Sequence, residues 1–184
     1  MIMSKTIIFI SGWNVPKFVA KSKLIWEEDF WNEYNCVWVS SKTPTSDLMV
    51  ERELDRLQRL LGRFPGATVA GQSLGAWWGA HLAHRPQVVI NKLVCWTPLY
   101  HADDYPIFNI TPRYSLSYKR ITENSGSSKV LTVLAKEDMI VPPMRHAYQL
   151  KEHFQGMGIV LDGGHLFQSN HKEGLIFMKK WIES

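Results

Sequence analysis

Six short runs rich in β-branched or aromatic residues recur along this chain, and most are followed by a turn signal and then by a helical pattern. The runs do not alternate with polar residues as a half-exposed strand does, which favours a parallel sheet covered on both faces. They lie at residues 6–11, 36–41, 67–71, 92–97, 129–135 and 158–163. We therefore predict an α/β protein, a three-layer α/β/α sandwich with a mainly parallel sheet of about six strands.

Helical patterns fill the spaces between these runs. The clearest begins at Asp47 and ends before Pro65, with apolar residues on one side and four arginines on the other. The arginines are Arg52, Arg56, Arg59 and Arg63. The predicted helices cover residues 47–63, 74–85, 143–154 and 172–182.

One domain accounts for the whole chain, because 184 residues fall within the usual size of a single hydrophobic core. The stretch at about 99–129 interrupts the strand and helix rhythm, is rich in tyrosine and proline, and closes with the residues NSGSS. Long irregular segments in compact domains often serve as lids or binding loops. We therefore expect one domain over residues 1–184 with a short lid-like insertion.

Composition disfavours several classes of protein. The formal net charge is +4 and the basic residues are spread along the chain, which does not argue for a nucleic-acid partner. No apolar run approaches the ~20 residues of a membrane span, and the first run is too short for a signal peptide. Cys36 and Cys95, the two cysteines, lie within apolar runs and are expected to be reduced core residues. We expect a cytoplasmic protein, and its oligomeric state stays open.

The stretch VAGQSLGAWW, residues 69–78, carries the strongest functional signal. Ser73 stands between Gly71 and Gly75, where the third run ends and a helical pattern begins. On such a sharp strand-to-helix turn the glycines permit close backbone contacts, and the serine hydroxyl is held above the sheet. A serine becomes a nucleophile only with an imidazole to take its proton and a carboxylate to orient that imidazole.

Later loops supply both partners at the carboxyl ends of predicted strands, where open α/β sheets bind ligands. Asp138 follows the fifth run, and His165 follows the sixth run after two glycines. Alternative acids are Glu137, Asp103 and Asp104.

A further element, an oxyanion site, is expected where the first run ends in Gly12 and Trp13. A backbone N–H at this turn could join that of Leu74 to hold an oxyanion.

These motifs resemble the α/β-hydrolase family over nearly the whole chain. The residues SGW, GQSLG, KEDMIVP and GGH stand in the family's order, and the chain is similar to its small, nearly lidless members. The resemblance implies Ser73 as nucleophile, His165 as general base and Asp138 as the acid. It also implies oxyanion N–H groups from Leu74 and Trp13 and no metal or cofactor.

One departure concerns the first turn. Many members of the family have His-Gly where this chain has Ser11 and Gly12, which makes Asn14 an alternative oxyanion donor to Trp13.

The resemblance implies a serine hydrolase that cleaves a carboxylic ester or a thioester through an acyl-enzyme intermediate. The alternative is a binding protein that keeps the fold without catalysis. For the substrate pocket we predict four residues near the elbow or the insertion, namely Gln72, Trp77, Tyr100 and Tyr105.

The arginine face and the histidines other than His165 have simpler interpretations. The arginines form either a solvated face or a surface that docks an acidic carrier protein bearing the acyl substrate. His81 and His84 lack a third ligand at useful spacing and are interpreted as packing or surface residues. The remaining four, expected in loops or on helix surfaces, are His101, His146, His153 and His171.

Overall fold

The computed structural model describes residues 5–16, 21, 26–102, 105–114, 129–147, 149, 156–166 and 171–184. Each of the six predicted runs forms a strand, and all neighbouring strands pair in parallel. The strands are β1 (Thr6–Ile10), β2 (Asn35–Val39), β3 (Thr68–Gln72), β4 (Lys92–Trp96), β5 (Lys129–Ala135) and β6 (Met157–Leu161). Their order across the sheet is β2-β1-β3-β4-β5-β6, so the predicted parallel sheet is confirmed.

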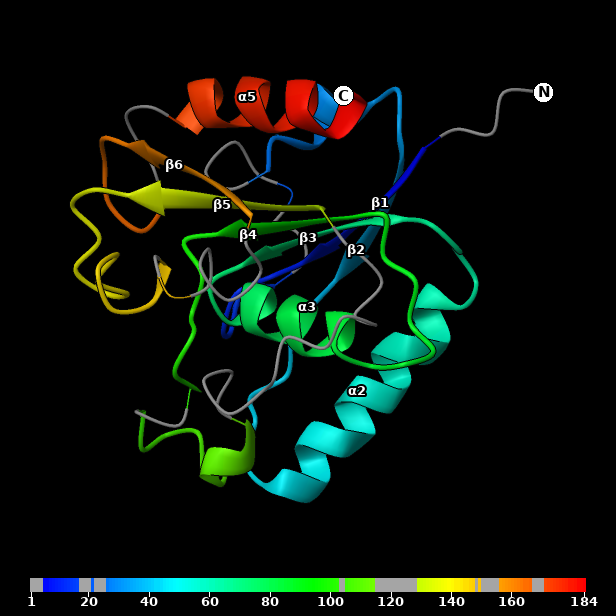
Figure 1. Ribbon diagram of the computed structural model, residues 1–184, viewed down its shortest axis with the longest axis vertical. Helices are drawn as coiled ribbons and strands as arrows, with labels where there is room; N and C mark the ends of the chain where they lie inside the picture. The colour runs from blue at the N-terminus through cyan, green and yellow to red at the C-terminus, as the bar shows by residue number, and fades with distance from the viewer. Residues whose placement is uncertain are drawn as a thin grey trace.

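Helices cover both faces of the sheet (Figure 1). The helices α2 (Asp47–Leu61) and α3 (Leu74–Ala83) lie on one face, and α5 (His171–Glu183) lies on the other. Short 3-10 helices occur at Glu28–Trp31 and Pro112–Tyr114. The predicted three-layer sandwich is therefore confirmed, with one apolar core on each side of the sheet.

Local chemistry explains where α2 begins and ends. The Ser46 hydroxyl accepts a hydrogen bond from the Met49 N–H at 3.2 Å, which satisfies a free donor of the first turn. The apolar side of the helix is buried, whereas Arg52, Arg59 and Arg63 are exposed. The helix ends at Leu61, two residues before the predicted end, because the N–H groups of Arg63 and Phe64 bond to carbonyls only three residues back.

The helix α3 is buried along its full length, as its small residues predicted. It ends at Ala83 rather than at residue 85, because the N–H groups of His84 and Arg85 bond to carbonyls only three residues back. The predicted helix at 143–154 is described only in part: residues 143–146 form turns, and 147 and 149 are helical. Residues 148 and 150–155, including His153, lie outside the described residues.

The described part of the insertion is fixed to the start of α2. Thr111 donates through its N–H and its hydroxyl to the Asp47 carboxylate, at 2.9 and 2.8 Å. Burial would raise the pKa of Asp47, but the hydrogen bonds from Thr111 and the charge of Arg113 lower it. Residues 115–128 of the predicted insertion lie outside the described residues.

The two cysteines are free, as predicted. Cys95 is buried in β4 and Cys36 is half-buried in β2, and burial raises the pKa of both thiols, that of Cys36 to about 11. Among the helices that the structure describes, none is long and apolar enough to cross a membrane.

Candidate active site

Ser73 stands on a strained turn between β3 and α3. Its backbone has φ 53° and ψ −118°, a conformation that side-chain-bearing residues rarely adopt and that costs on the order of 1–3 kcal/mol. The turn is held by the Ser73 N–H, which donates to the Trp96 carbonyl at the end of β4 at 2.9 Å. Strain of this kind concentrates at functional sites.

Both flanking glycines are required by close backbone contacts. A β-carbon at Gly71 would stand 2.3 Å from the Gly75 carbonyl oxygen, and one at Gly75 would stand 2.1 Å from the Ile10 carbonyl oxygen. Non-bonded atoms do not approach so closely, so neither position accepts a larger residue without movement of the backbone. The predicted reason for the two glycines is confirmed.

Asp138 and His165 meet at the same end of the sheet. His165 Nδ1 lies 2.7 Å from Asp138 Oδ2, and the two side chains are only 10% and 2% exposed. Asp138 Oδ1 accepts hydrogen bonds from the N–H groups of Ile140 and Val141 at 2.9 and 2.8 Å. A carboxylate oxygen accepts hydrogen bonds, so this contact fits the tautomer in which Nδ1 carries the proton and Nε2 carries the lone pair.

The alternative acid Glu137 occupies a different position. Its carboxylate accepts a hydrogen bond from the Gly163 N–H, and its own N–H donates to the Gly163 carbonyl at 3.1 Å. Glu137 thus ties the loop after β5 to the loop that carries His165. Asp103 and Asp104 lie outside the described residues.

The end of β4 brings the serine turn and the histidine loop together. Trp96 holds the Ser73 N–H, and the next residue, Thr97, donates from its hydroxyl to the His165 carbonyl at 3.3 Å. Within the described residues the Ser73 hydroxyl makes no hydrogen bond to His165. Such bonds are often long in the free enzyme and shorten only in the substrate complex.

The turn after β1 carries two of the three backbone N–H groups that the sequence analysis named as oxyanion donors, Trp13 and Asn14, and Leu74 carries the third. Among the described residues, the N–H groups of Trp13, Asn14 and Leu74 donate no hydrogen bond. That of Leu74 begins α3, where backbone donors have no partner within the helix. The Trp13 indole donates to the Thr43 hydroxyl at 3.0 Å, which fixes the ring beside this turn.

Two of the predicted pocket residues, Gln72 and Trp77, have buried side chains. Gln72 is only 2% exposed, and its Oε1 has no hydrogen-bond partner among the described residues and would stand 2.3 Å from a β-carbon at Gly12. Gln72 therefore lies directly beneath the turn after β1. Trp77 is fully buried, with its ring against Trp78 and His81 at 4.7 and 4.2 Å between centroids. Position along the chain could not reveal that both side chains turn inward.

The other two predicted pocket residues, Tyr100 and Tyr105, lie in the insertion. The hydroxyl of half-buried Tyr105 donates to the Ile140 carbonyl at 3.1 Å, which places this side chain against the loop of Asp138. Tyr100 is buried, which raises the pKa of its hydroxyl, and its N–H donates to His146 Nδ1 at 3.2 Å. His146 lies in a turn, in agreement with one of its two predicted positions, and its side chain is a buried acceptor.

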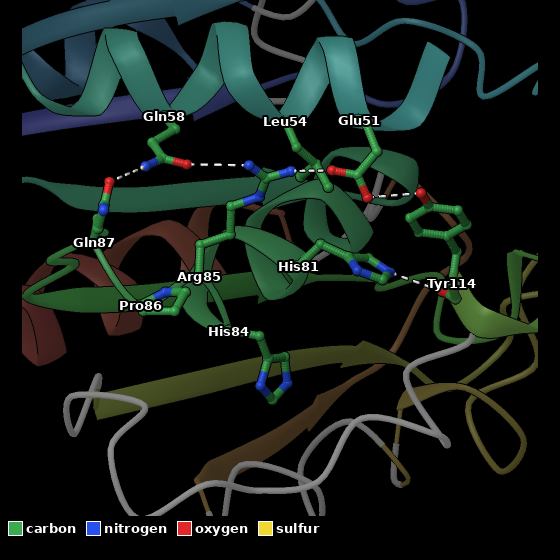
Figure 2. A pocket seen from close by; sticks show the side chains of 9 residues that line it. All are labelled: Glu51, Leu54, Gln58, His81, His84, Arg85, Pro86, Gln87 and Tyr114. Atoms are coloured by element: carbon green, nitrogen blue, oxygen red, sulfur yellow. Dashed lines mark hydrogen bonds and ion pairs between the residues drawn. The ribbon is translucent and has the colours of Figure 1, made fainter. Parts of the chain in front are cut away.

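A polar cavity of about 380 Å³ lies between α2 and α3 (Figure 2). His81 bonds through Nε2 to the Tyr114 carbonyl at 2.8 Å, and the Tyr114 hydroxyl donates to Glu51 at 2.7 Å. Burial, and then the bond to Glu51, raise the pKa of Tyr114 to about 12. Buried His81 is thus a packing residue, as predicted, and this network holds Tyr114 of the insertion against the two helices.

Comparison with known proteins rests on structure alone. No family model matches the chain, and no curated protein matches it in sequence. Solved structures match over nearly its whole length. They include MGS-MChE2, an alpha/beta hydrolase enzyme from the metagenome of lagoon sediments at Mar Chica, Morocco, which has 15% identity and a TM-score of 0.68, with 98% of this chain and 91% of that one covered.

The chain has the α/β-hydrolase fold.

Two further α/β-hydrolase-fold comparisons support this assignment. The ydeN gene product of B. subtilis has 10% identity and a TM-score of 0.71, with 98% of this chain and 100% of that one covered. Est1E from Butyrivibrio proteoclasticus has 12% identity and a TM-score of 0.69, with 97% and 87% covered. The resemblance expected from the sequence motifs is confirmed at the level of the fold.

Proposed function

We propose that this α/β-hydrolase-fold chain is a serine hydrolase that cleaves a carboxylic ester, or a thioester, through an acyl-enzyme intermediate. The observation that carries the proposal is the 2.7 Å contact between Asp138 and His165 at the sheet end where Ser73 stands on its strained turn. A similar solved structure is described as a hydrolase enzyme, which agrees with this chemistry.

In the proposed reaction, Ser73 Oγ attacks the carbonyl carbon of the ester, and its proton passes to His165 Nε2. The carbonyl π electrons move to the oxygen, and the resulting oxyanion accepts hydrogen bonds from the N–H groups of Leu74 and Trp13, with Asn14 as the alternative to Trp13. Collapse breaks the ester bond, and the alcohol leaves with the proton from His165.

Water then attacks the acyl-enzyme with His165 again as base, which releases the carboxylic acid and restores Ser73. Asp138 stays ionised and holds the imidazolium throughout. These steps need no metal or cofactor.

The test is hydrolysis of p-nitrophenyl acetate and butyrate by the wild type and by Ser73→Ala. The proposal expects saturable hydrolysis that Ser73→Ala reduces by at least about 10³-fold in kcat. Ser184→Ala, an exposed serine at the end of α5, is the matched control and keeps the wild-type rate. Equal rates for all three proteins would instead favour the alternative, a non-catalytic binding protein with this fold.

A specific surface favours an ester carried on an acidic carrier protein. Residues 42–59 line a groove of about 660 Å³, and its charged residues are Lys42, Arg52, Glu53, Asp55, Arg56 and Arg59. The groove adjoins the turn after β1, because Ser41 Oγ donates to the Gly12 carbonyl at 2.9 Å. Arg56 is paired with buried Glu53 at 2.6 Å, whereas Arg52 and Arg59 make no ion pair with any described residue.

The carrier hypothesis predicts a difference between substrates. Arg52→Glu with Arg59→Glu should lower kcat/KM for a carrier-bound ester at least tenfold and leave p-nitrophenyl acetate hydrolysis unchanged, because only the carrier reaches the groove. If charge reversal leaves kcat/KM for the carrier-bound ester unchanged, the carrier hypothesis is rejected. The proposal of a serine hydrolase is not affected by that result.

A further inference from the structure

Three lysines gather at the amino end of the sheet, at the opposite end of the strands from Ser73. Lys5, Lys92 and Lys129 line a cavity of about 290 Å³ together with Thr6, Thr68, Asn91 and the last residues of α5. In Figure 1 the carboxyl end of α5 and the start of β1 lie toward the same end of the sheet.

Strand register explains why the three side chains share one face. Lys92 on β4 pairs directly with Lys129 on β5, and on its other side with Thr68 on β3. Thr68 pairs with Ile7, and Lys5 stands two residues before Ile7, so strand alternation places Lys5 on the same face. Like charges directly opposite on neighbouring strands destabilise a sheet.

The three lysines make no ion pair with a described carboxylate, although Glu183 also lines the cavity. Within the described residues, no carboxylate oxygen lies within 4.0 Å of the ammonium group of any of the three lysines. The nearby Glu183 accepts instead from the Tyr34 hydroxyl at 2.8 Å. Lys92 is only 5% exposed, and burial, then the charges of Lys129 and Lys5, lower its pKa.

Capping of α5 accounts for part of this arrangement. Lys92 Nζ donates to the carbonyls of Trp181 and Ile182 at 2.6 and 2.9 Å, where a cation is favoured by the end of the helix. These two bonds use two of the three N–H groups of Lys92. They do not explain why Lys129 and Lys5 also line the cavity. Both of these lysines are exposed and make no ion pair with the described residues.

We propose that this cavity binds a phosphate group, either inorganic phosphate or the phosphate of a small phosphomonoester. A phosphate dianion accepts hydrogen bonds from several ammonium groups at once, and lysine binds phosphate as a point charge. The hydroxyls of Thr6 and Thr68 and the amide of Asn91 add neutral donors around it. The cavity provides room for a phosphomonoester as well as for the free ion.

The test is isothermal titration calorimetry of the full-length wild type with sodium phosphate and, in a separate arm, with glycerol 3-phosphate. Ionic strength is held constant with sodium chloride, so that the screening of charge interactions is the same throughout the titration. The variant is Lys5→Ala with Lys129→Ala, which leaves the buried Lys92 and its cap on α5 in place. The matched control is Lys136→Ala with Lys172→Ala, two exposed lysines away from this cavity with the same change in net charge.

We expect saturable binding of at least one probe to the wild type and to the control, and affinity at least about tenfold weaker in the Lys5 and Lys129 variant. Tighter binding of glycerol 3-phosphate than of phosphate would assign the site to a phosphomonoester, and the reverse order to the free ion. Absence of binding to the wild type, or equal loss of affinity in the variant and the control, would overturn the proposal and leave Lys92 as a helix cap only.

Discussion

The Asp138 carboxylate uses one oxygen to hold His165 Nδ1 at 2.7 Å and the other to accept the N–H groups of Ile140 and Val141. The backbone after Asp138 therefore fixes the carboxylate, and the carboxylate fixes the imidazole ring of His165. Both contacts are present without a bound substrate.

Removing the charge of Asp138 should reduce the proposed catalysis without unfolding the protein. Asp138→Asn keeps an acceptor for the loop N–H groups but no longer stabilises an imidazolium, and the analogous change in a known Ser-His-Asp protease lowers kcat about 10⁴-fold. We expect a fall of about 10³-fold or more in kcat for p-nitrophenyl acetate.

Glu137→Gln is the matched comparison for Asp138→Asn, since Glu137 bonds to Gly163 and not to His165. It should retain most of the wild-type kcat. A larger loss from Glu137→Gln than from Asp138→Asn would mean that the acid has been assigned to the wrong residue.

The closest backbone contact at the serine turn predicts a strong effect on stability. Gly75→Ala places a β-carbon 2.1 Å from the Ile10 carbonyl oxygen and should lower the free energy of unfolding by about 1–3 kcal/mol or more. Gly62→Ala, whose β-carbon would meet nothing nearer than 3.5 Å, should change it by well under 1 kcal/mol. Urea denaturation of both variants measures the difference, and equal free energies would contradict the contact.

Gln72 offers a test of a buried group without a partner. Gln72→Met keeps the volume of the side chain and removes Oε1, a buried acceptor with no partner within the described ranges, whose desolvation costs about 1–3 kcal/mol. The free energy of unfolding should therefore stay the same or rise by about 1 kcal/mol in urea denaturation. A clear loss of stability would show that the amide has a hydrogen-bond partner in solution.

The buried His171 side chain should make the free energy of unfolding depend on pH. The residue is only 6% exposed, and neither ring nitrogen has a hydrogen-bond partner in the part of the chain that the structure describes. Burial lowers its pKa, against the smaller opposing effect of Glu27. In the unfolded chain the ring takes up a proton near pH 6.5, whereas the folded ring does so only at lower pH. Below pH 6.5 the unfolded state therefore binds more protons, and the free energy of unfolding falls as the pH falls.

The corresponding variant is His171→Phe, which keeps a ring against Trp96 and does not titrate. Urea denaturation at pH 7.5 and at pH 5.5 should show a smaller loss of stability for the variant than for the wild type. If the wild type and the variant lose the same free energy of unfolding between pH 7.5 and pH 5.5, groups other than His171 cause the pH dependence.

The sheet and the serine turn were predictable because each leaves a local signal. Continuous apolar runs mark strands buried on both faces, and Gly71 and Gly75 mark backbone contacts that exclude a side chain. The choice between neighbouring Glu137 and Asp138 also has a local reason, because the short aspartate side chain reaches backbone N–H groups two and three residues ahead.

The sequence did not predict which side chains are buried at positions outside the strand runs and the serine turn. The sequence around His146 and His171 does not reveal that they are buried, because tertiary contacts with Tyr100 and Trp96 decide their position. Gln72 and Trp77 flank Ser73 closely in sequence, yet the side chain of each turns away from the solvent.

Covalent labelling tests the central claim most directly. The wild type, Ser73→Ala and His165→Ala are exposed to a fluorophosphonate, and the intact mass of each protein is measured over time. The account predicts a single phosphonyl adduct on the wild type, no adduct on Ser73→Ala and at least about 10³-fold slower labelling of His165→Ala. Folded wild type without an adduct, or an adduct of equal rate on Ser73→Ala, would contradict an activated serine at this position.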